Sequence, residues 1–191
     1  MMTVMIADGH PLFREALCEV IRSMDADHRI YEASTLEQAR QLAAAGGPSG
    51  AWGDTRLALD IILLELRLPG SVGFSAIAEL RNAASDVPIV VVSAATARPI
   101  VRNSISYGAS GFIPKSFSAS EISAAVRRVL NGELFLPNEA ITGSLSGHDP
   151  PGNLHDRVAT LTPRQLKGFG LVAKGKSNKE IASTSASRYQ R

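Results

Sequence analysis

The chain has 191 residues, of which 45% are hydrophobic and 20% are charged, and its formal net charge is +2. This composition is typical of a folded globular protein and excludes a disordered or fibrous chain. No apolar run reaches the length of about 18 residues that crosses a bilayer, and the first residues lack the basic start of a signal peptide, so we expect a cytoplasmic protein without membrane contact.

Five short apolar segments alternate with helical patterns along the first part of the chain. The segments are TVMIA (3–7), RIYEA (29–33), IILLE (61–65), PIVVVS (88–93) and GFIP (111–114). The alternation predicts an α/β fold, with a five-stranded parallel sheet and crossover helices. The first helix is expected at about 10–24, and Cys18 within it is expected to be a buried apolar residue without a redox role.

Helix starts are indicated by a hydroxyl residue followed three positions later by an acid or amide, because the two side chains cap each other's backbone N–H groups. The pattern occurs at Ser34 with Glu37, Ser118 with Glu121, Thr162 with Gln165, and Ser177 with Glu180. A glycine-rich surface loop is expected at 46–54. We predict a domain at 1–137, a linker at 138–160 and a small helical segment at 161–191.

Polar side chains lie at four of the predicted strand ends. Asp8 follows the first strand, Glu65 ends the third, Ser93 ends the fourth and Lys115 follows the fifth. In a doubly wound sheet these ends meet at one edge if the strand order is the flavodoxin-like one, and such a set is suited to a cation or a phosphoryl group. The simpler alternative is that each is only a polar group at a strand terminus.

Several motifs resemble the receiver domain of bacterial two-component response regulators of the NarL/FixJ, or LuxR-type, subfamily. They are IADGHPLFREAL, IILLELRLPG, VVVSA and GASGFIPKS, and the resemblance covers roughly 3–137. The run LTPRQLKGFGLVAKGKSNKEIAS at 161–183 is similar to the first half of the LuxR-type helix-turn-helix domain. The resemblance implies a flavodoxin-like (βα)5 receiver followed by a small, incomplete all-α segment.

The resemblance also implies a switch in which a histidine kinase transfers a phosphoryl group, with Mg²⁺, to an aspartate at the end of strand three. Glu65 stands at that position, and the family's acidic pair after strand one is here Asp8 followed by Gly9. The other matching positions keep the family's residue types: the switch hydroxyl at Ser93, the switch aromatic at Phe112 and the phosphoryl-contacting lysine at Lys115.

Both departures oppose phosphorylation. The extra methylene of Glu65 displaces the attacking oxygen by about 1 Å, and such a misplacement can cost about 100-fold in rate. Gly9 removes a carboxylate from the Mg²⁺ site, so neither this ion nor a histidine kinase partner is expected. Three roles remain open for Glu65. It only keeps the pocket polar in a receiver that is a fixed scaffold, or it pairs with Lys115 and biases the receiver toward an active-like state, or it is phosphorylated after all. The sequence favours the first two.

The C-terminal part of the chain is basic, because residues 151–191 hold eight Lys and Arg against two Asp and Glu. Candidate contacts to DNA phosphate are Lys167, Lys174, Lys176 and Lys179. A solvated basic face is the alternative. Since the resemblance fades after Ser183 and leaves no recognition helix, binding to DNA is expected to be weak and unspecific.

Three functions remain open at this point. The first is an atypical, truncated LuxR-type response regulator of transcription. The second is an interaction module that pairs with itself or with another response regulator. The third is an enzyme such as an aspartate-nucleophile phosphatase, which is least favoured because His10 stands where a second acid is needed. We therefore expect a regulator without enzymatic activity.

Overall fold

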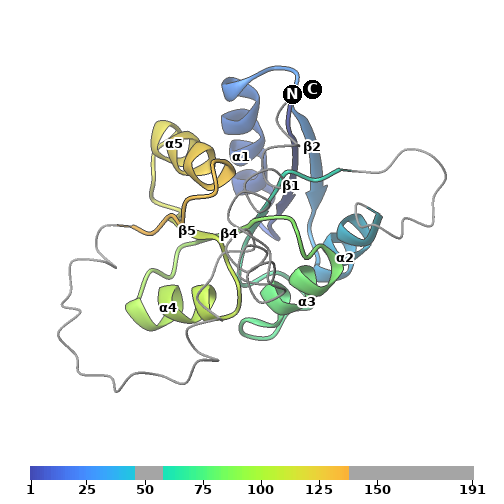
Figure 1. Ribbon diagram of the computed structural model, residues 1–191, viewed down its shortest axis with the longest axis vertical. Coiled ribbons are helices and arrows are strands. Elements are labelled where there is room, and N and C mark those ends of the chain that lie inside the picture. Colours follow the sequence, from blue (N-terminus) through green and yellow to red (C-terminus); the bar gives the residue numbers. More distant parts are fainter. Residues whose placement is uncertain (46–57, 138–191) are drawn as a thin grey trace, which may run out of the picture.

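The structure is a computed structural model, and it describes residues 1–45 and 58–137 (Figure 1). Within these residues five strands alternate with five helices. They are β1 (Thr3–Ala7), α1 (Pro11–Met24), β2 (Arg29–Ala33), α2 (Leu36–Ala45), β3 (Ile61–Leu64), α3 (Ser75–Ala83), β4 (Ile89–Ser93), α4 (Arg98–Ser106), β5 (Gly111–Pro114) and α5 (Ala119–Leu130). The sheet is parallel with the order β2-β1-β3-β4-β5. This confirms the predicted flavodoxin-like receiver fold.

The sheet is covered on both faces, with α1 and α5 on one side and α2, α3 and α4 on the other (Figure 1). Successive side chains of a strand point to opposite faces, so Met5 of β1 packs toward α2–α4 whereas Val4 and Ile6 pack toward α1 and α5. All four residues of β3 are buried. Burial on both faces explains why the strands are continuous apolar runs rather than alternating patterns.

The observed strands are slightly shorter than predicted at two ends. β3 ends at Leu64 and β4 begins at Ile89. Glu65 is therefore the first residue after β3, although its backbone N–H still donates to the carbonyl of Ala7 at 2.8 Å. That hydrogen bond holds the start of the β3–α3 connection against the end of β1.

The capping prediction is right for α5 and wrong for α2. At α5, Ser118 Oγ accepts from Glu121 N while the Glu121 carboxylate accepts from Ser118 N at 2.8 Å. At α2 the pair is shifted by one residue: Thr35 Oγ1 accepts from Gln38 N at 3.3 Å, and Gln38 Oε1 accepts from Ser34 N. The reason is tertiary, because the buried Leu36 begins α2 and donates its N–H to the carbonyl of Pro69 at 2.9 Å.

Several predictions concern residues outside the described ranges. These are the loop at 46–54, the linker at 138–160, the helical segment at 161–191 with its two capping pairs, and the four lysines of that segment. Among the described helices, none is long and apolar enough to cross a membrane.

Candidate functional site

The structure brings together the four polar side chains that the sequence places at strand ends. Asp8 follows β1, Glu65 follows β3, Ser93 is the last residue of β4, and Lys115 follows β5. The carboxylates are almost fully buried, since the side chains of Asp8 and Glu65 are 1% and 4% exposed. The sheet order makes this possible, because β1, β3 and β4 are direct neighbours and β5 lies next to β4.

Lys115 lies between the two buried carboxylates. Its Nζ atom is 2.6 Å from Asp8 Oδ2 and 2.6 Å from Glu65 Oε2. The ammonium also lies 4.3 Å from the ring centroid of Phe13 on α1, a cation–π contact. The sequence predicts the pair with Glu65 but not the equal contact with Asp8. Helical periodicity predicts only that Phe13 lies on the buried face of α1. Its position in the first turn of that helix, shortly after Asp8, is the sequence signal that could have placed it near the site.

The second oxygen of Glu65 is also satisfied. Glu65 Oε1 accepts hydrogen bonds from Ser93 Oγ at 3.3 Å and from the backbone N–H of Arg67 at 3.1 Å. Together with Lys115, three donors therefore converge on one buried carboxylate, as a buried anion requires. A group of donors that binds one anion is suited in the same way to a phosphoryl oxygen.

The second oxygen of Asp8 faces His10, a residue that the sequence offers only as evidence against a phosphatase. Asp8 Oδ1 accepts from the backbone N–H of His10 at 2.8 Å and lies 3.0 Å from the ring atom His10 Nδ1. The His10 side chain is 67% exposed. The Asp-x-His spacing in the β1–α1 turn is the signal that could have found this contact, since an Asp side chain in a turn can bond the backbone two residues on.

Gly9 packs tightly against the loop that follows β3. A Cβ atom added at this position would lie 2.7 Å from Cδ and 3.1 Å from Cγ of Pro69. A carboxylate at position 9 therefore does not fit unless Pro69 moves. The two buried carboxylates bind Lys115, and Gly9 offers no further carboxylate to the Mg²⁺ site that the resemblance implies.

Phe112 lies apart from the polar groups. It is fully buried in β5 and belongs to the apolar cluster on the α2–α4 face of the sheet, with Val101 and Ile105 of α4. Its backbone pairs in register with Val91 of β4. Its side chain thus links the site-bearing strands to α4 by packing.

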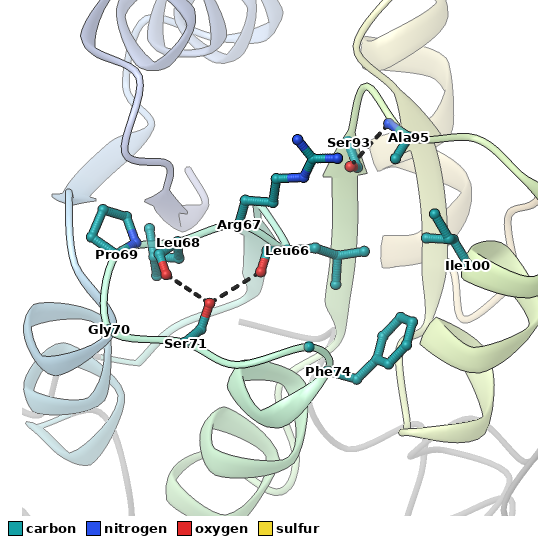
Figure 2. A pocket seen from close by; sticks show the side chains of 11 residues that line it. Leu66, Arg67, Leu68, Pro69, Gly70, Ser71, Phe74, Ser93, Ala95 and Ile100 are labelled. Carbon is teal, nitrogen blue, oxygen red and sulfur yellow. Dashed lines mark hydrogen bonds between the residues drawn. The ribbon is translucent and has the colours of Figure 1, made fainter.

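A cleft of about 440 Å³ lies beside the site, between the β3–α3 connection and the start of α4. Figure 2 shows the Arg67 side chain extending toward Ser93 and Ala95, with Phe74 and Ile100 on the opposite wall. Ser71 Oγ donates to the carbonyls of the connection and holds it in a tight turn. The cleft is lined by one cationic side chain, Arg67, by the two hydroxyl residues Ser71 and Ser93, and otherwise mostly by apolar residues.

Cys18 is buried in α1, as predicted. Burial, followed by the charge of Glu32, raises the pKa of the Cys18 thiol. The thiol therefore stays protonated at neutral pH, which agrees with a packing role.

Comparison with known proteins identifies both sequence relatives and structural neighbours of this chain. Residues 4–127 match the response regulator receiver domain family. The chain is 37% identical over 187 residues to the glycerol metabolism activator of Pseudomonas putida, covering 95% of this chain and 80% of that protein. It is 31% identical over 183 residues to the nitrate/nitrite response regulator protein NarL of Escherichia coli, covering 94% and 79%.

The fold is also similar to that of a solved LuxR family DNA-binding response regulator from Silicibacter pomeroyi. The TM-score is 0.59 at 26% identity, and the match covers 73% of this chain and 99% of that chain. The two sequence relatives match nearly the whole chain, including residues beyond 127.

Proposed function

The chain belongs to the response regulator receiver family, and from this premise we propose that it is a response regulator of transcription that is not switched by aspartyl phosphorylation. In this proposal residues 1–137 form the receiver, 138–160 a linker and 161–191 the part that faces DNA. The observation that carries the proposal is the position of Lys115 Nζ, 2.6 Å from both Asp8 and Glu65.

The first argument is that Glu65 uses the donors that a phosphoryl group would need. Lys115, Ser93 and the N–H of Arg67 all bind the Glu65 carboxylate. A phosphoryl group on Glu65 would have to displace these donors from the oxygens that they now hold. The Glu65 carboxylate therefore occupies the donors that a phosphoryl group would otherwise bind.

The second argument concerns the cation. The charge of Lys115 lies between Asp8 and Glu65, and Gly9 contributes no third carboxylate. Phosphoryl transfer depends on a cation that neutralises the developing charge on the transferred group. Without a fitting Mg²⁺ site, transfer to Glu65 is disfavoured independently of the longer side chain.

The third argument supports transcription as the output. Relatives that match nearly the whole chain are named as an activator of glycerol metabolism and as the response regulator NarL, and the solved neighbour is named as a DNA-binding protein. The basic composition of 151–191 agrees with a segment that contacts phosphate.

The phosphorylation part is tested with acetyl phosphate and Mg²⁺, followed by intact mass spectrometry. We expect no phosphoryl adduct on this chain, whereas a receiver that keeps the aspartate and its acidic pair is labelled under the same conditions. The Glu65→Asp variant is the matched control for side-chain length. An adduct that maps to Glu65 in the unchanged chain contradicts the proposal.

The state of the receiver is tested by replacing Glu65 with Gln. This variant keeps the length of the side chain but removes the charge that binds Lys115. If the charge of Glu65 holds an active-like state, DNA retention by the full chain, measured by genomic-fragment enrichment, changes between the two proteins. Equal enrichment supports a fixed scaffold in which Glu65 only keeps the site polar.

Self-association or pairing with another response regulator is part of the proposal for partners. Multi-angle light scattering after size exclusion measures the mass of the chain alone and after mixing with a full-length relative. A monomer that does not change on mixing contradicts this part and leaves the phosphorylation test unaffected.

A further inference from the structure

The cleft between the β3–α3 connection and α4 is separate from the buried ion pairs. Its volume of about 440 Å³ lies within the range of about 300–1,000 Å³ that small-molecule sites occupy. Of the four strand-end side chains, Ser93 lines this cleft, whereas Asp8, Glu65 and Lys115 do not. A ligand can therefore enter the cleft while Lys115 remains bound between its two carboxylates.

Arg67 gives the cleft one positive charge. Its side chain is exposed, and Figure 2 shows its guanidinium without a hydrogen bond to the other lining residues. The carboxylate of Glu65, two residues earlier, binds Lys115, Ser93 and the backbone N–H of Arg67. The guanidinium presents a planar fork of N–H donors to the cleft, and this fork matches the two oxygens of a carboxylate.

The wall opposite Arg67 is apolar. It is formed by Phe74 and Ile100 (Figure 2). The Phe74 ring stacks on Tyr107 with the ring centroids 5.3 Å apart, and this contact limits its rotation. A ligand that reaches from Arg67 to this wall needs an apolar body next to its charged group. An aromatic ring is suited to this position, because aromatic rings form offset or edge contacts with one another.

We propose that this cleft binds a small aryl carboxylate, with the carboxylate on Arg67 and the ring against Phe74 and Ile100. A single negative charge fits better than a phosphate dianion, since one cationic side chain lines the cleft. The anion of Glu65 also lies only 3.3 Å behind Ser93 Oγ and repels additional negative charge. The site is thus distinct in both place and charge from a phosphoryl site at the strand ends.

Two residues of the cleft also hold Glu65. Ser93 Oγ donates to Glu65 Oε1 at 3.3 Å, and the backbone N–H of Arg67 donates to the same oxygen at 3.1 Å. Ser93 Oγ in turn accepts from the backbone N–H of Ala95 at 3.3 Å. A ligand bound to Arg67 therefore changes the surroundings of these hydrogen bonds, and the amide signals of Arg67 and Ala95 report on it.

The test is a titration of the full chain with naphthoate, followed by two-dimensional amide NMR with assigned signals. We expect saturable shifts at Arg67, Ala95 and Ile100. Arg67→Gln, at an exposed position, should weaken naphthoate binding by at least about tenfold, because a charge-assisted hydrogen-bond pair is lost. Ile100→Ala should weaken it less, since it removes part of the apolar wall. The neutral probe naphthamide should bind the unchanged chain at least about tenfold more weakly than naphthoate.

The control variant is Arg22→Gln, at an exposed position of α1 outside the cleft, and it should retain the naphthoate affinity. The assignment of the shifts matters because the eight Lys and Arg of residues 151–191 also attract anions. The proposal is overturned by absence of saturable shifts in the cleft, by equal affinity of the Arg67→Gln variant, or by tighter binding of naphthamide or inorganic phosphate than of naphthoate. It does not depend on the transcriptional role, and a phosphoryl adduct on Glu65 would leave it standing.

Discussion

At the scale of single residues, the site depends on the charge balance among Asp8, Glu65 and Lys115. A buried ion pair need not add net stability, because the desolvation of both charges offsets their attraction. Removal of one partner is different, since the other charges remain in a low-dielectric environment without compensation. Lys115 is critical in this respect because it is shared by two carboxylates that are themselves almost inaccessible to water.

The first prediction follows from that sharing. Lys115→Met should lower the free energy of unfolding by about 3–5 kcal/mol, because it leaves two buried carboxylates without their counter-charge. Urea denaturation followed by far-ultraviolet circular dichroism measures the change. The triple variant Lys115→Met, Asp8→Asn, Glu65→Gln should recover most of it. A decrease below about 0.5 kcal/mol in the single variant would show that water reaches these carboxylates.

The second prediction concerns Gly9. Gly9→Asp should lower the free energy of unfolding by about 1–3 kcal/mol, because its Cβ atom would lie 2.7 Å from Cδ of Pro69. The shift of the urea midpoint measures this effect. In the background Pro69→Ala, which removes the contacting ring atoms, the same substitution should cost less. Equal costs in the two backgrounds would exclude the contact with Pro69 as the cause.

At the scale of elements, the residues of the site lie at the carboxyl ends of the strands and in the connections that follow them. The connections after β1 and β3 supply Asp8 and Glu65, and the turn after β3 needs Gly70 because its φ angle is +91°. Helix starts are less tightly specified by local sequence. The α5 start follows its capping pattern, whereas at α2 the burial of Leu36 and its hydrogen bond to Pro69 shift the cap by one residue.

The third prediction tests the α5 cap. Ser118→Ala should lower the free energy of unfolding by about 1 kcal/mol, because it removes the acceptor for an N–H of the first turn. Thermal unfolding at pH 7 measures the decrease. Ser116→Ala, at an exposed position just before the helix, is the matched control and should be close to neutral. Equal decreases in both variants would contradict a specific role of the cap.

The fourth prediction is the pH dependence of that cap. The hydrogen bond from the Ser118 side chain, followed by that from its backbone, lowers the pKa of Glu121 below its usual value of 4.5. A lowered pKa in the folded state means that the stabilisation is complete above about 4.5 and is lost as the pH falls through the folded pKa. Unfolding curves from pH 7 to pH 3 should therefore converge for Glu121→Gln and the unchanged chain. Parallel curves over this range would contradict the assignment.

At the scale of the whole molecule, the chain combines a receiver with an unequal charge distribution. Residues 1–150 hold 12 Lys and Arg against 16 Asp and Glu, whereas residues 151–191 hold eight against two. Like charges on the receiver and DNA repel, so attraction to phosphate is expected from the C-terminal part alone. Such attraction depends steeply on salt because bound phosphates release counterions.

The fifth prediction concerns this salt dependence. Replacing Lys167, Lys174, Lys176 and Lys179 together with Gln should reduce the slope of log affinity against log salt by about 0.9 for each phosphate that the chain no longer binds. Fluorescence anisotropy with a labelled DNA duplex, at several salt concentrations, measures the slope. Arg22→Gln with Arg40→Gln, two exposed positions of the receiver, is the control and should leave the slope unchanged. A slope that changes equally in both variants would assign phosphate binding to the receiver.

The amino-acid sequence is sufficient to predict the fold class and the polar residues of the site. Apolar runs of strand length between amphipathic helices specify a parallel sheet, and polar residues at the strand ends identify Asp8, Glu65, Ser93 and Lys115. These are local signals, because each depends on residues within one turn or one strand. The strand bounds follow from the same local patterns except at the end of β3 and the start of β4.

The pairing of those residues depends on tertiary structure. Asp8 and Lys115 are 107 positions apart, and no local pattern shows that one ammonium binds two carboxylates, that Phe13 lies over it, or that His10 faces the second oxygen of Asp8. The close approach of Pro69 to Gly9 is likewise invisible in the sequence. Contacts of this kind depend on the order of strands and the packing of connections, which bring distant residues within hydrogen-bonding distance, whereas local periodicity specifies only which elements form.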